Sequence, residues 1–196
     1  ATPIDKKDLE VTHTTNPIAA IEVIDGELIT NRLDIAPTVV NNLNVSDTSK
    51  DLLKIVVVNR YSKAKPAVAF IKNFQLQEGA LASSVAHDSH NIIAVGVDDD
   101  SIAQAINLII KQKGGISAVS KKQEKIIPLP VAGLMSDGDG YRVATDYIEI
   151  DKMVKAMGSK LLSPFMSLSF MALLVIPSIK LSDLGLFDGK KFEFLK

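Results

Sequence analysis

The strongest constraint on the fold is a mostly apolar, β-branched run at residues 52–58, which reads Leu-Leu-Lys-Ile-Val-Val-Val. A run without polar alternation is typical of a strand that is buried on both faces of a sheet. Residues 92–96 form a second apolar run, and residues 67–74 predict a further strand. The chain is therefore expected to build a sheet whose central strands are covered on both sides.

Two segments have helical periodicity. In residues 101–113 the apolar side chains recur at the spacing of one buried helix face, and Gly114-Gly115 is expected to end the helix. Ser101 and Gln104 have the spacing of a capping box. Asp98, Asp99 and Asp100 could bind a metal, but capping at the positive end of the helix is the favoured interpretation. Residues 143–157 predict a second amphipathic helix that ends at Gly158.

Hairpins are interspersed with these elements. Asp25-Gly26 predicts a two-residue turn between strands at 18–24 and 27–30, and a charged tip separates strands at 116–119 and 126–129. Residues 36–50 are rich in Asn, Asp, Ser and Thr and are expected to form a loop. The fold class predicted is therefore α/β, a single domain with a mixed β-sheet packed by amphipathic helices, with hairpin insertions.

Two irregular segments complete this interpretation. Residues 128–136 combine two prolines and a glycine with apolar side chains and are predicted to be buried and irregular, and residues 164–177 are expected to form compact core. Residues 1–17 are polar and aperiodic and are interpreted as a leader or a cut linker, so the domain is expected to span residues 18–196.

Composition excludes several classes of partner. The net charge is −1 without a long basic block, so neither nucleic acid nor an anionic membrane surface is expected to bind. The chain has no cysteine, which fits a reducing compartment. The N-terminus lacks the pattern of a signal peptide, and the apolar stretch 164–177 is shorter than the roughly 20 residues that cross a bilayer. We therefore expect a soluble, cytoplasmic protein.

A dense polar cluster precedes the apolar run at 92–96. Residues 83–91 read Ser-Ser-Val-Ala-His-Asp-Ser-His-Asn and contain two of the three histidines of the chain. One interpretation is a loop that leads into a strand and caps backbone groups; the other is a catalytic or ligand-binding site. A metal site on His87, Asp88 and His90 is disfavoured, because residues three apart in a strand point to opposite faces. The sequence contains no P-loop, no dinucleotide-binding fingerprint and no Gly-x-Ser-x-Gly elbow.

The run 80–96 closely resembles a motif of the C-terminal domain of bacterial adenine deaminases, which belong to the amidohydrolase superfamily. The resemblance continues through Pro128–Ser136 and Pro164–Phe170, and it also covers residues 175–177 and 180–186 in the same order. One departure concerns Tyr61, which follows Arg60 where relatives often have histidine, and this bears on any role of Arg60.

The resemblance implies an enzyme of purine salvage that hydrolyses adenine to hypoxanthine and ammonia. In that family a manganese or iron centre lies in a (β/α)₈ barrel that precedes this domain. A barrel needs about 250 residues, so it must lie outside this chain, on the same or another polypeptide. The fragment alone is expected to be inactive and to hold no metal or other cofactor, and the enzyme is expected to be a homo-oligomer. Segments 128–135 and 164–174 are expected to expose apolar surface toward the barrel.

The resemblance also suggests roles for the polar cluster. His87 and Asp88 are the predicted catalytic residues, as a pair that orients or shuttles a proton. Ser84, His90 and Asn91 are the predicted adenine-binding residues. The competing view is that the cluster holds the interface with the barrel through hydrogen bonds. A different class of function also stays open, in which the chain is a catalytically inert binding or assembly module that packs on a partner barrel.

Overall fold

An eight-stranded mixed sheet forms the centre of the protein, which a computed structural model describes for residues 1–14 and 16–195. Among the described residues, neighbouring strands are antiparallel except for the parallel pair β2 and β7. The strand order is β11 (Glu124–Pro128), β10 (Gly115–Val119), β8 (Ala80–Ser83), β9 (Ile92–Gly96), β6 (Leu53–Val58), β7 (Ala67–Lys72), β2 (Ile18–Val23) and β3 (Thr30–Ile35). The prediction of an α/β domain with a mixed sheet is confirmed.

Strand β6 is buried along its whole length, as its composition predicts. Leu53, Ile55 and Val57 enter the apolar core on one face of the sheet. Val56 and Val58 enter the core on the opposite face. This alternation follows from the two-residue period of a strand, and it requires a covering layer on each side.

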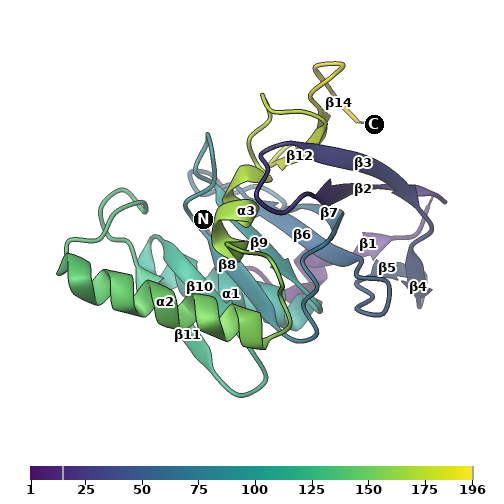
Figure 1. Ribbon diagram of the computed structural model, residues 1–196. Helices are drawn as coiled ribbons and strands as arrows, with labels where there is room; N and C mark the ends of the chain where they lie inside the picture. Colours follow the sequence, from purple (N-terminus) through teal and green to yellow (C-terminus); the bar gives the residue numbers. More distant parts are fainter. Residues whose placement is uncertain (15, 196) are drawn as a thin grey trace.

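The helices supply those two layers (Figure 1). Helix α1 (Asp99–Gln112) covers one face through Ile102, Ile106 and Ile109. Helices α2 (Gly140–Ala156) and α3 (Pro164–Phe170) cover the other face, together with a small C-terminal sheet. That sheet contains β12 (Ile179–Ser182), β13 (Gly185–Asp188) and β14 (Glu193–Phe194). No helix in the described part of the chain is long and apolar enough to cross a membrane.

The N-terminal end of α1 differs from the expected one, whereas the helix ends just before Gly114, as predicted. Asp98, not Ser101, is the N-cap, and its side chain accepts a hydrogen bond from the Ser101 amide. Lys113 is the C-cap, with a left-handed φ of 61°. The predicted capping box is therefore wrong, because Ser101 lies inside the helix and its hydroxyl donates to Asp98 at 2.9 Å.

The first hairpin has a longer connection than predicted. The turn at Asp25-Gly26 forms, because the amide of Glu27 donates to the carbonyl of Ile24 at 3.0 Å, but the last strand pair is Val23 with Thr30, so residues 24–29 form a six-residue connection. The reason is tertiary: the buried hydroxyl of Thr30 donates to the carbonyl of Ile179 at 2.8 Å, and the Lys180 ammonium donates to the carbonyl of Leu28 at 2.6 Å. These bonds hold the loop against β12.

The polar segment 36–50 contains strands as well as loop. Strand β5 (Leu43–Val45) pairs with β4 (Thr38–Val40) on one side and with β1 (Val11–Thr12) on the other, which makes a three-stranded sheet. Asn41 and Asn42 join β4 and β5 with φ values of 49° and 62°. Asparagine tolerates this left-handed backbone, so a polar pair makes a tight hairpin. The prediction of a plain loop is wrong here.

The N-terminal residues pack on the domain. A short 3₁₀ turn, η1 (Lys6–Leu9), lies against α1, and Leu9 is fully buried in the core beneath that helix. The boundary predicted at residue 17 stays a prediction.

The segment after β11 is only partly buried. Leu129 is buried, whereas Val131 and Met135 form an isolated bridge and are 42% and 57% exposed. The expectation of a buried irregular segment therefore holds for its beginning and fails for its tip. Residues 164–177 likewise combine buried residues such as Phe165 and Leu168 with the exposed side chains of Met166 and Val175.

Candidate active-site turn

The polar cluster forms a tight turn between the adjacent strands β8 and β9. The amide of His90 donates to the carbonyl of Ala86 at 2.7 Å, which closes the turn around residues 87–89. His90 has a left-handed φ of 53°. A non-glycine residue is uncommon in this region, so the surrounding contacts must hold the turn in place. Residues 87–90, with these backbone contacts, are called the candidate turn below.

His87 connects the candidate turn to α3. Its amide donates to the carbonyl of Ser169 at 3.1 Å. Its ring stacks on Phe170 with centroids 5.1 Å apart and an angle of 25° between the planes. The ring of His90 meets the ring of His87 edge-on at 5.7 Å. The motif that ends in Asn91 and the motif that ends in Phe170 are therefore neighbours in space.

His90 presents a buried ring nitrogen without a partner. Among the described residues, no hydrogen bond satisfies its Nδ1 atom. The pKa of His90 is lowered from its ordinary value, first by burial and then by the positive charges of His87 and Arg60, while Asp88 opposes the shift. Buried polar atoms are nearly always paired in proteins, so an unpaired one marks a place where a ligand or a docking group can bind.

Asp88 lies at the surface and does not form the predicted pair with His87. No hydrogen bond or salt bridge joins Asp88 to either histidine of the candidate turn in the described structure, and its side chain is exposed. Asp88 and Ser89 line one side of a cavity of about 430 Å³, whose other walls are mostly apolar and include Val175, Leu184 and Phe192. The carboxylate thus faces the outside of the domain, where an added group would meet it.

Ser84 and Asn91 flank the candidate turn and point into the protein. The fully buried Ser84 hydroxyl donates to the carbonyl of Gly133 at 2.6 Å and accepts from the amide of Gly115 at 2.9 Å. The Asn91 side chain, 2% exposed, accepts from the amide of Arg60 at 3.0 Å. Both groups are engaged in holding backbone, and their predicted contact with adenine stays a prediction.

Arg60 and Tyr61 contact the candidate turn, and no site role was predicted for them from the sequence. The Arg60 guanidinium donates to the carbonyls of His90 at 2.9 Å and Ala132 at 2.8 Å. The Tyr61 hydroxyl accepts from Arg60 at 3.0 Å and donates to the carbonyl of Ser89 at 2.9 Å.

A sequence signal for this contact does exist. Because Val58 pairs with Ile92 in antiparallel register, continuing β6 by two residues brings Arg60 opposite His90.

The described residues contain no group of three or more His, Cys, Asp or Glu side chains placed to hold an ion. The donors of the candidate turn, two imidazoles meeting edge-on and a carboxylate facing outward, do not fit the metal centre that the resemblance implies.

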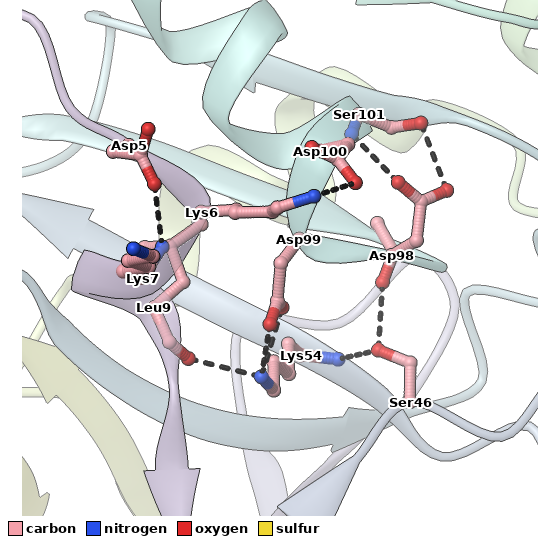
Figure 2. Close-up of polar contacts among 11 residues, drawn as sticks. Asp5, Lys6, Lys7, Leu9, Ser46, Lys54, Asp98, Asp99, Asp100 and Ser101 are labelled. Carbon is pink, nitrogen blue, oxygen red and sulfur yellow. Dashed lines mark hydrogen bonds and ion pairs between the residues drawn. The ribbon is translucent and has the colours of Figure 1, made fainter.

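A second polar network lies on the opposite face, at the start of α1 (Figure 2). The Lys54 ammonium, from β6, contacts Asp99 and the carbonyl of Leu9, while Asp98 caps the helix through Ser101. Burial raises the pKa of Asp99, and its hydrogen bonds from Lys54 oppose that shift. The capping interpretation of this acidic run is confirmed for Asp98, and Asp99 serves as an ion-pair partner.

Comparison with known proteins places these features in a family. The family described as "Adenine deaminase C-terminal domain" matches residues 27–193. Proteins named adenine deaminase are similar over most of the chain: the protein of Sulfurovum sp. (strain NBC37-1) is 54% identical over 89% of this chain and 32% of its own length. That of Methanosarcina mazei is 49% identical over 93% of this chain and 33% of its own length.

A third relative, from Salinibacter ruber, is 46% identical over 100% of this chain and 36% of its own length. The chain thus spans about a third of the length of the curated relatives it matches. The match takes in all the segments that meet at the candidate turn. The resemblance noted from the three motifs is confirmed, and the chain belongs to the adenine deaminase C-terminal domain family.

Proposed function

We propose that this chain is the C-terminal part of an adenine deaminase, which hydrolyses adenine to hypoxanthine and ammonia. The observation that carries the proposal is the family match over residues 27–193, together with relatives named adenine deaminase that are three times as long. In this proposal a (β/α)₈ barrel outside the chain supplies the manganese or iron centre, since the donors found here do not fit one.

The surface around the candidate turn supports a partner domain at that place. Exposed apolar side chains surround α3 and the C-terminal sheet; they are Leu162, Met166, Val175, Leu184 and Phe192. Leu162 and Met166 line one cavity with Phe170, on which His87 stacks, and the other three line a second cavity with Asp88. Contiguous exposed apolar surface is typical of an interface. The proposed occupant is the barrel, which would bring its open end against the candidate turn.

The chemistry available in the candidate turn is proton transfer. In hydrolytic deamination a water oxygen bonds to C6 of the purine, the bond from C6 to the exocyclic nitrogen breaks, and that nitrogen leaves as ammonia after gaining a proton. His90, whose Nδ1 has no hydrogen-bond partner among the described residues, and the half-buried His87 are suited to hold or pass that proton. The outward Asp88 carboxylate would accept a hydrogen bond from an amino or ring N–H group.

The test uses the longest polypeptide that contains this chain, purified with manganese or iron. We expect adenine to be consumed with equal amounts of hypoxanthine and ammonia, and adenosine, guanine and cytosine to be inert under the same conditions. This 196-residue chain alone is the matched control and is expected to release no ammonia. Absence of hypoxanthine from the metal-loaded polypeptide would overturn the proposal.

A second candidate function is an inert assembly module, and the inward direction of Ser84 and Asn91 favours it. Both side chains stabilise the domain and leave fewer groups to contact a substrate. The two functions differ in what the barrel does alone. A barrel expressed without this chain that keeps its full kcat with adenine would favour the module. A barrel that folds and loads metal but loses kcat would favour the catalytic role.

A further inference from the structure

Arg60 joins two segments that are far apart in the sequence. Its Nε atom donates to the carbonyl of His90, and its Nη1 atom donates to the carbonyl of Ala132. The neighbouring Gly133 has a φ of 73°, and a Cβ atom there would lie 1.9 Å from Nη1 of Arg60. A side chain at Gly133 would therefore displace the guanidinium. Because Gly133 has no side chain, its backbone can pack directly against Arg60, which indicates that the fold specifies the position of the guanidinium.

Tyr61 extends the same contact to the next carbonyl of the turn. The guanidinium lies 5.0 Å from the centre of the Tyr61 ring and also donates to its hydroxyl. That hydroxyl donates in turn to the carbonyl of Ser89. Two successive carbonyls, of Ser89 and His90, are thus held by two successive side chains from the end of β6.

We propose that Arg60, assisted by Tyr61, is a positioning residue that holds His87, Asp88 and His90 in the arrangement used for adenine deamination. The inference rests on the proposed function. It deepens that function because it assigns the geometry of the candidate turn to two residues whose hydrogen bonds to the turn go to its backbone carbonyls.

The location of these bonds indicates that they position the candidate turn and contribute little to the stability of the whole domain. Tyr61 is 67% exposed, and the bonds of Arg60 to Ala132 and Tyr61 lie at the surface. Exposed polar contacts contribute little to folding, because water replaces them readily. His90, in contrast, needs external contacts to hold its left-handed backbone. We call the bonds from Arg60 and Tyr61 to the carbonyls of His90 and Ser89 the clamp. Its loss is therefore expected to shift the candidate turn while the domain stays folded.

An arginine is required at this place for a geometric reason. The planar guanidinium presents several N–H groups in fixed directions, so it reaches two carbonyls and a hydroxyl at once. Lysine keeps the positive charge but concentrates it on one ammonium at the end of a flexible chain. Arg60→Lys therefore removes the geometry and preserves the charge near His90. Tyr61→Phe removes only the hydroxyl and preserves the ring.

The kinetic test measures both variants in the complete metal-loaded enzyme with adenine. We expect Arg60→Lys to lower kcat by about 10- to 100-fold, as is typical of a displaced catalytic group, and Tyr61→Phe to lower it several-fold. Melting temperature and metal content should stay close to the wild-type values. Arg142→Lys and Tyr141→Phe, on the exposed surface of α2, are the matched controls and should keep the wild-type kcat.

An independent readout is the NMR titration of the histidine rings in the same proteins, labelled with ¹³C at histidine. In the wild-type protein His90 should titrate below its ordinary pKa. In Arg60→Lys it should titrate closer to the ordinary value, because the loosened turn is less buried while the neighbouring charge is kept. A purely structural contact elsewhere in the fold would leave this titration unchanged.

The outcomes separate the two proposals. A wild-type enzyme without deaminase activity would overturn the proposed function, while the histidine titration would still test the clamp. An active enzyme in which Arg60→Lys keeps kcat within about twofold and leaves the His90 titration unchanged would overturn the positioning role. Loss of kcat in Arg60→Lys that is accompanied by a large fall in melting temperature, with an unchanged kcat in Tyr61→Phe, would also overturn it.

Discussion

The ammonium of Lys54 lies 2.8 Å from each carboxylate oxygen of Asp99, and 1% of the lysine side chain is exposed (Figure 2). A third bond joins the same ammonium to the carbonyl of Leu9 at 2.9 Å. One buried charge thus connects the central strand β6, the first turn of α1 and the N-terminal segment. Lys54 is also the only charged residue within β6, so its partners decide whether the strand tolerates it.

The first prediction concerns this pair. Asp99→Asn leaves the Lys54 charge buried without an anion and should lower the free energy of unfolding by about 3–5 kcal/mol. Lys54→Met should cost less, because the Asp99 side chain is 23% exposed and can turn toward water. Urea denaturation of both single variants and the double variant measures the coupling. Asp100→Asn, in the exposed pair with Lys6, is the control and should change little; equal effects of Asp99→Asn and Asp100→Asn would contradict the prediction.

The second prediction concerns Lys180 and pH. Burial lowers the pKa of this fully buried lysine from 10.5 to about 8. Between these values the unfolded chain binds more protons than the folded one, so the contribution of Lys180 to stability rises with pH, by at most about 1.4 kcal/mol per unit. Below pH 8 the cost of the buried charge is fully present.

Lys180→Met should remove that pH dependence. At pH 7 the variant should be at least as stable as the wild type, although it loses the bond to the carbonyl of Leu28. The stability difference between the two proteins should then shift in favour of the wild type from pH 8 to pH 10. Denaturant titrations at each pH measure this difference, and a difference that is constant with pH would refute the assignment.

The third prediction separates catalysis from interface formation at the candidate turn. In the complete enzyme, His87→Ala and Asp88→Asn should each lower kcat by about 10²-fold or more if these groups transfer or orient protons. Because Asp88 is exposed, Asp88→Asn should leave the melting temperature of this chain unchanged. Asp137→Asn, exposed on the loop before α2, is the control. If instead the variants lose contact with the barrel, while the molecules that stay assembled keep the wild-type kcat, the result would favour an interface role.

The fourth prediction concerns Ser84 and Asn91. Ser84→Ala leaves the amide of Gly115 and the carbonyl of Gly133 without their partner, and should cost about 1–3 kcal/mol of stability. Asn91→Ala leaves the partly buried amide of Arg60 without its partner and should cost an amount toward the lower end of this range. If Asn91 also contacts adenine, its variant should raise KM beyond any effect seen with Ser84→Ala. Steady-state kinetics and thermal melts of the same samples distinguish the two roles.

The local sequence pattern was sufficient to predict an element where the spacing of its apolar side chains matches the faces that are buried. The run at residues 53–58 predicts a strand that is buried on both sides, and the recurrence of Ile102, Ile106 and Ile109 predicts α1. Local pattern was insufficient where distant groups compete for the backbone. The Asp25-Gly26 turn forms as predicted, but the strands separate before reaching it because Thr30 and Lys180 bond to other segments.

The candidate site divides in the same way. The sequence by itself determined the family, through three motifs, and the chemistry of the residues in the turn. Only the tertiary structure decided their directions. Ser84 and Asn91 point inward to backbone partners, Asp88 points outward, and one ring nitrogen of His90 has no partner among the described residues. The physical reason is that a side chain's direction depends on which hydrogen-bond partners the packed strands bring within reach. The register of β6 against β9, which brings Arg60 opposite His90, exists only once the sheet has formed.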